Sequence, residues 1–221
     1  MTHVPWTAQL IDLGAAVLLL TSFSMLSQRR IFSLVNLYAW QGAVLSMATA
    51  AVAYTSGQNH LYVSAALSLG LKVIALPLIL HRLIRKLNVR WDTEPMLNIP
   101  TTMLVGILLV VFSFALSKPI AQLSTSIARS TLGIAMAVVM LSFLMMITRR
   151  KAVTQVIGFL AMENGLFFAA TSATHGMPMI VELGVALDVL VGTLILGVFF
   201  FQIREQFDSL DLQHLEKLKE D

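Results

Sequence analysis

The chain contains no cysteine and has few charged residues. The absence of cysteine excludes disulfides, cysteine-ligated iron–sulfur clusters and covalently attached c-type haem. Only 12% of the residues are charged and 57% are hydrophobic, whereas a soluble domain carries about 25% charged and about 45–50% apolar residues. The mean hydropathy of +0.81 agrees with this excess. The apolar surface of this chain must therefore face something other than water.

Apolar runs long enough to cross a bilayer, about 18 residues or more, recur along the chain. We therefore predict an all-α integral membrane protein with about seven transmembrane helices. No basic region precedes the first run, so we expect no cleavable signal peptide. The predicted spans are 8–27, 31–54, 60–81, 100–118, 127–147, 152–174 and 178–203.

Basic residues mark alternate loops between these spans. The loops after the even spans carry only Lys118 and Arg129. Because loops rich in Lys and Arg stay in the cytoplasm, we predict that the N-terminus is outside and the C-terminus inside. The net charge of +3 is then a signal of topology, and we expect no nucleic-acid partner. The residues after the odd spans are Arg29, Arg30, Arg82, Arg85, Lys86, Arg90, Arg149, Arg150, Lys151, Arg204, Lys217 and Lys219.

Three ionisable side chains fall near the middle of predicted spans. They are Lys72, Glu163 and Asp188, and Gln41 and Asn164 add polar groups at similar depth. A charge at the bilayer centre costs at least about 2.5–3.5 kcal/mol, so these residues require an explanation. One interpretation is structural, with Lys72 paired with Asp188 or Glu163. The other is a proton path, because a buried carboxyl beside a buried amine can exchange a proton at modest cost.

Other chemistry finds little support in the sequence. All five histidines fall at span ends or in the tail, which argues against a haem held by two histidines. No His, Asp and Glu set has metal-ligand spacing within one helix, and no nucleophile lies near a base. We therefore predict no catalytic residue, cofactor or metal site. Pro77 is expected to kink the third span and to free the carbonyl of Val73.

The chain also resembles itself. The stretch 68–74 lines up with 184–190, which matches Lys72 to Asp188, and an Arg-Arg pair precedes both the second and the sixth span. We predict a parallel repeat of two three-helix units. The domains are then 1–99, a connecting helix at 100–120, a second unit at 121–204, and an amphipathic cytoplasmic tail at 205–221. The tail is either a surface helix or a docking segment for a partner.

The stretches 147–150 and 156–164 resemble the NuoK-type small subunit of respiratory complex I. In that subunit an arginine-rich turn leads into a helix with a central glutamate, and a second acid lies in the following helix. Glu163 and Asp188 occupy these places, and the resemblance covers about residues 127–204. Two departures leave the proton geometry open. The second acid is the shorter Asp, and Asn164 follows the glutamate directly.

The whole chain is similar to the component E family of hydrogenase-4-type complexes. This resemblance implies a non-catalytic membrane subunit of a group 4 nickel–iron hydrogenase or formate hydrogenlyase assembly, related to complex I, in a bacterial or archaeal inner membrane. The implied partners are antiporter-like membrane subunits and a peripheral cytoplasmic arm. It also implies that Glu163 and Asp188 lie on a proton path, and the internal repeat makes Lys72 their counterpart in the first unit.

Three other functions are compatible with parts of this pattern. A structural adaptor would use the buried charges only to pack helices. A subunit of a cation/proton antiporter is a further alternative, because NuoK-like modules also occur there. A rhodopsin-like pump is rejected, because its retinal lysine belongs in the seventh span with an acid in the third. Here Lys72 lies in the third predicted span and Asp188 in the seventh.

Overall fold

The computed structural model describes residues 6–57, 59–86, 97–121 and 126–174, together with Gly184, Leu187, Val191 and Gly192. Six helical spans in this part of the chain are long and apolar enough to cross a membrane. They confirm six of the predicted spans and the all-helical, multi-pass class. The seventh span at 178–203 lies outside the described residues except for those four positions, and the tail at 205–221 lies wholly outside them.

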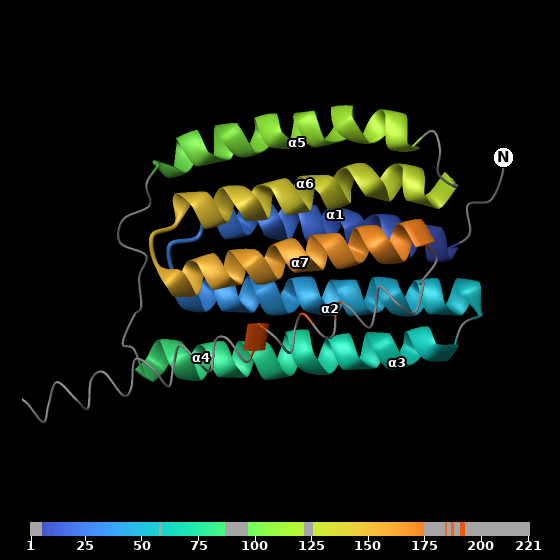
Figure 1. Cartoon of the computed structure of the whole chain (residues 1–221), viewed down its shortest axis with the longest axis horizontal. Helices are drawn as coiled ribbons and strands as arrows, with labels where there is room; N and C mark the ends of the chain where they lie inside the picture. The colour runs from blue at the N-terminus through green and yellow to red at the C-terminus, as the bar shows by residue number, and fades with distance from the viewer. Residues whose placement is uncertain are drawn as a thin grey trace, which may run out of the picture.

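Three successive elements form the third span as one continuous helix: α3, the π-helical segment η1 and α4 (Figure 1). This span ends at Lys86, beyond the predicted end at residue 81. Leu83 and Ile84 are buried on one side of the added turn while Arg82 and Arg85 are exposed on the other. The bounds are α1 Trp6–Ser27, α2 Ile31–Ser56, α3 Asn59–Ser68, η1 Leu69–Ala75, α4 Leu76–Lys86, α5 Ile99–Ala121, α6 Ser126–Thr148 and α7 Ala152–Thr174.

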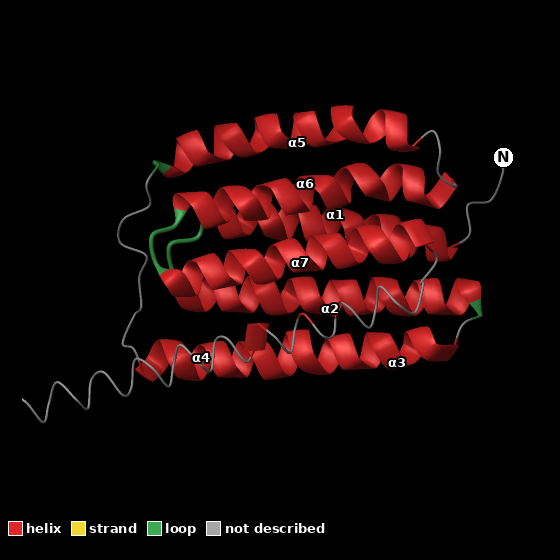
Figure 2. Ribbon diagram, viewed as in Figure 1, coloured by secondary structure: helices red, strands yellow, loops and turns green. Residues whose placement is uncertain are grey.

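The helices form a bundle in which two helix pairs make the centre. Helix α1 packs on α6 and α2 packs on α7, while α5 and the third span lie on opposite outer sides (Figure 1). The tight turns 28–30 and 149–151 lie at the same end of the bundle (Figure 2). Helices α2 and α7 therefore run in the same direction, as a parallel repeat requires. The repeat itself and the proposed domain boundaries remain predictions.

The outer helix α5 presents an apolar face away from the bundle. Leu104, Leu108 and Val111 are each more than 60% exposed. Such side chains suit a lipid-facing helix, since in a bilayer they need no protein partner. Helix α5 packs on α6 and α1 and connects the two halves of the described chain.

Arg149 has a structural role that its sequence context did not indicate. It is only 4% exposed, and its Nη2 donates to the carbonyls of Met25 and Leu26 at 3.3 and 3.1 Å and also to that of Gln28. The last carbonyls of a helix lack intrahelical partners, so this guanidinium caps the C-terminal end of α1. The side-chain amide of Gln155 in turn donates to the Arg149 carbonyl. Arg149 is therefore more than a loop charge, because its guanidinium also joins the turn 149–151 to the turn 28–30.

Candidate functional site: a buried polar cluster

The centre of the bundle holds an ion pair between Lys72 and Glu163. The distance from Lys72 Nζ to Glu163 Oε1 is 2.7 Å, and the side chains are 0% and 6% exposed. Lys72 comes from η1 in the third span and Glu163 from α7, so the pair joins segments 91 residues apart. The sequence left the partner of Lys72 open between Glu163 and Asp188. The structure pairs it with Glu163, and Asp188 lies outside the described residues.

A chain of amide hydrogen bonds lies next to this pair. Asn164 Nδ2 donates to Gln41 Oε1 at 3.3 Å, and Gln41 Nε2 donates to Ser22 Oγ at 2.8 Å. Ser22 is itself bonded to the carbonyl of Leu18 one turn earlier in α1. All three polar side chains are buried. They link α7, α2 and α1 at the depth of the ion pair.

Ser22 was not predicted as part of this cluster. A serine in an apolar helix usually satisfies itself by bonding a carbonyl four residues back, and Ser22 does so. Its second role, as acceptor from Gln41, depends on how α1 packs on α2. Only the conspicuous amide at position 41 could have indicated that a nearby helix must supply a partner.

The backbone around Lys72 is π-helical over Leu69–Ala75. At its end the Leu76 N–H bonds the Leu71 carbonyl, five residues back. The next residue, Pro77, has no N–H to continue either an α-helical or a π-helical ladder. This wider turn ends two residues before Pro77, and the expected kink there stays a prediction. π-Helical turns are rare and occur frequently at functional sites.

Two neighbours fix the environment of Lys72. Gly42 on α2 lies so close that a Cβ added to it would stand 2.9 Å from the Lys72 Cβ and 3.4 Å from its backbone carbonyl. The ring of Phe167 on α7 has its centroid 5.7 Å from the Lys72 ammonium, within cation–π distance. A Cβ on Gly184 would in turn stand 2.7 Å from the Phe167 ring and 3.9 Å from Glu163 Oε1. Glycines on two sides thus let helices close around the pair.

Only two members of the cluster can gain or lose a proton. The amides of Gln41 and Asn164 supply hydrogen bonds, whereas Lys72 and Glu163 carry ionisable groups. Within the described residues no three His, Cys, Asp or Glu side chains lie together as a metal site would require.

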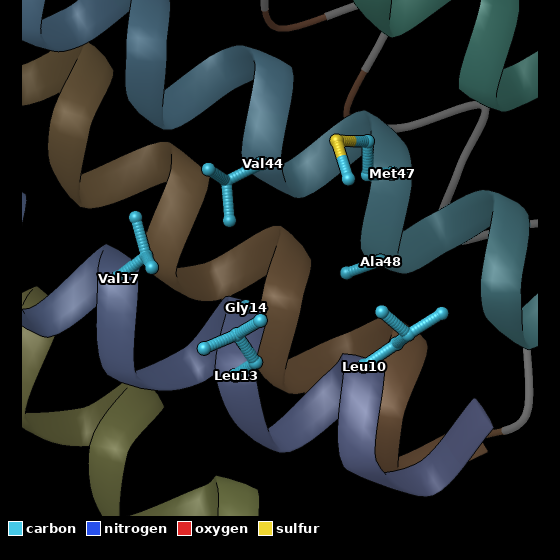
Figure 3. Close-up of a pocket in the computed structure, with 7 residues that line it drawn as sticks. All are labelled: Leu10, Leu13, Gly14, Val17, Val44, Met47 and Ala48. Atoms are coloured by element: carbon cyan, nitrogen blue, oxygen red, sulfur yellow. The ribbon is translucent and has the colours of Figure 1, made fainter. Parts of the chain in front are cut away.

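A second feature, an apolar hollow of about 100 Å³ between α1 and α2, contains no group able to do chemistry (Figure 3). The missing side chain of Gly14 helps to form it. Every lining residue is apolar, so the candidate site is the polar cluster. The hollow is lined by Leu10, Leu13, Gly14, Val17, Val44, Met47 and Ala48.

Comparison with known proteins gives relatives of the same length. No family model matches the chain and no solved structure matches it. The uncharacterized protein Rv0085 of Mycobacterium tuberculosis (strain ATCC 25618 / H37Rv) is 31% identical over 212 residues, which cover 96% of each chain. Hydrogenase-4 component E of Escherichia coli (strain K12) is 22% identical over 205 residues, which cover 93% of this chain and 95% of the relative. The Shigella flexneri protein of that name matches equally.

Proposed function

Since this chain belongs to one family with the mycobacterial protein Rv0085 and is related at family level to hydrogenase-4 component E, we propose that it is a membrane subunit of a multisubunit hydrogenase or complex I-like assembly. Its role there is to couple redox turnover to proton movement, with Lys72 and Glu163 as the proton-handling pair. The subunit itself carries no redox centre and no catalytic residue in this proposal.

The observation that carries the proton-coupling role is the buried ion pair between membrane-crossing helices. Lys72 and Glu163 approach to 2.7 Å with almost no exposure. Removing a charged pair from water is expensive, and apolar residues of similar volume often stabilise a core as well or better. Ionisable residues inside membrane proteins commonly mark ion and proton pathways for this reason. The amides of Asn164 and Gln41 hold α7 against α2 beside the pair.

The finer features of the proposal extend beyond the described residues. We propose a seventh span at 178–203 that brings Asp188 to the same depth, with the N-terminus outside and the C-terminus inside. Residues 121–204 form a NuoK-like unit, 1–99 a first unit and 205–221 a tail available to a cytoplasmic partner. The partners are antiporter-like membrane subunits and a peripheral arm in a bacterial or archaeal inner membrane.

A structural adaptor is the second candidate, and one observation favours it. The Lys72–Glu163 contact joins the outer third span to the central helix α7, which an adaptor would also need. The variant Lys72→Met with Glu163→Leu separates the two functions, because it keeps apolar packing and removes both charges. An adaptor would assemble and couple normally with this change, whereas a proton-coupling subunit would assemble and lose coupling.

The experiment that tests the assembly itself is affinity purification. The chain is tagged at its C-terminus and extracted from its native membrane in mild detergent. The proteins that co-purify with it are then identified. Hydrogenase or complex I-like subunits in stoichiometric amount are the expected result. A chain that purifies alone, or with cation/proton antiporter subunits only, contradicts the hydrogenase-type assembly.

A further inference from the structure

The π-helical segment Leu69–Ala75 contains one residue more than an α-helix would place between the same flanks. One residue turns an α-helix by about 100°, so an inserted residue normally rotates everything that follows. A π-turn absorbs the insertion locally. Here both flanks keep their buried faces, since Leu61 and Ala65 are buried before the segment and Leu80 and Ile84 after it. The residues inside the segment therefore leave the α-helical register.

Lys72 lies at the middle of this segment and is its buried residue. Gly42 on α2 lies opposite Lys72. Because glycine has a hydrogen in place of a side chain, the Lys72 backbone can approach α2 closely. From this position the ammonium reaches Glu163 Oε1 on one side and the Phe167 ring on another. A lysine pushed away from Gly42 would move its ammonium relative to Glu163 Oε1.

We infer that the π-helical segment Leu69–Ala75, seated on Gly42, is a positioning element that holds the Lys72 ammonium against Glu163. This inference deepens the proposed function, since it concerns the same pair. In the proposed function neither Gly42 nor the backbone of the segment takes up or releases a proton. They act through the placement of Lys72, since the absence of a Cβ at Gly42 allows the segment to approach α2 at Lys72.

Two variants disturb the element in different ways. Deletion of Gly70 removes the extra residue, so the segment can form a regular α-helix between its flanks. We expect this change of one residue to rotate the Lys72 side chain relative to Glu163. Gly42→Ala is milder, because its methyl group meets the Lys72 Cβ at 2.9 Å and pushes the segment outward. The matched control is Gly14→Ala, where the added Cβ meets its neighbours at an ordinary 3.6 Å.

The measurement is infrared spectroscopy of the purified chain in lipid nanodiscs at neutral pH, with the Glu163 signal identified by subtraction of the Glu163→Gln spectrum. A carboxylate in an apolar core takes up a proton when its cation moves away. We expect the native chain and Gly14→Ala to show the Glu163 carboxylate band. Gly42→Ala and the Gly70 deletion should lose more than half of it to the protonated carboxyl band.

A full Glu163 carboxylate band in folded Gly42→Ala overturns the inference, and so does a full band in the folded deletion variant. Helical circular dichroism and a native elution volume establish folding, and the milder Gly42→Ala decides if the deletion does not fold. The outcome is separable from the proton role. If both variants lose the band and Glu163→Gln shows normal coupling, the positioning element is supported and the proposed function is contradicted. If both variants keep the band and Glu163→Gln loses coupling, the positioning element is contradicted and the proposed function is supported.

Discussion

Lys72 and Glu163 stabilise each other in a place where either charge alone would be costly. Their side chains are 0% and 6% exposed and they meet at 2.7 Å. The Phe167 ring adds a third favourable contact to the ammonium. The free energy of the folded chain should therefore depend on the two residues jointly, which a double-mutant cycle can measure.

We predict that Lys72→Met destabilises the folded chain by about 3–5 kcal/mol, because it leaves a buried carboxyl without its cation. Adding Glu163→Gln to Lys72→Met should recover most of that loss. Unfolding in detergent, followed by circular dichroism, gives the comparison. A loss in the double variant equal to the sum of the two single losses would show that the residues do not stabilise one another.

The sequence located these residues but not their arrangement. Lys72, Glu163, Gln41 and Asn164 could be singled out because each interrupts an apolar run. The partner of Lys72 could not be chosen, since two acids were available at similar depth. Packing of the third span on α2 and α7 made the choice, through Gly42 and Phe167, and neither residue looks polar or unusual in the sequence.

At the scale of elements, the spans were predictable and their internal geometry was not. Apolar length determines where a helix can cross a bilayer, and six predicted spans appear as helices. A π-turn differs from an α-helix by one inserted residue and leaves no hydrophobic signature, so the turn at 69–75 was missed. The end of α4 at Lys86 was missed for another reason. Its last turn is amphipathic, with Arg82 and Arg85 exposed, and looked like a loop.

The tight turns at one end of the bundle depend on Arg149. Its guanidinium donates to three carbonyls at the C-terminal end of α1, and hydrogen bonds from a charged donor contribute more than neutral ones. We predict that Arg149→Ala lowers the free energy of unfolding by about 1.5–3 kcal/mol. Thermal unfolding in detergent measures the effect.

The adjacent Arg150 provides the control, because it has the same charge and is exposed. Arg150→Ala should change the melting temperature far less than Arg149→Ala. Similar shifts for the two variants would mean that net charge at this end of the bundle, and not the cap on α1, determines stability there.

At the scale of the whole molecule, exposed arginines gather at one end of the bundle. The turns 28–30 and 149–151 lie there, and α4 ends there with Arg82 and Arg85 (Figure 1). From the positive-inside rule we predict that this end is cytoplasmic. The orientation is therefore a prediction with a direct test.

The absence of native cysteine makes that test clean, since a single introduced cysteine has no background. Asn59→Cys and Gln28→Cys lie at opposite ends of the bundle. We predict that a membrane-impermeant maleimide labels Asn59→Cys on intact cells and labels Gln28→Cys only after permeabilisation. The reverse pattern would invert the topology and with it the side from which a peripheral arm could dock.

The central claim is that Glu163 handles protons for the complex in which the chain resides, and one measurement tests it most directly. Proton translocation is followed with a pH-sensitive dye in membrane vesicles during redox turnover, for Glu163→Gln and for Asp12→Asn. Both changes replace a carboxyl by an amide, but Asp12 is exposed on α1, far from the ion pair in sequence. We predict assembly in both variants, with proton translocation lost in Glu163→Gln and kept in Asp12→Asn. An assembled Glu163→Gln complex that translocates protons at the native rate would contradict the claim and leave the pair a purely structural one.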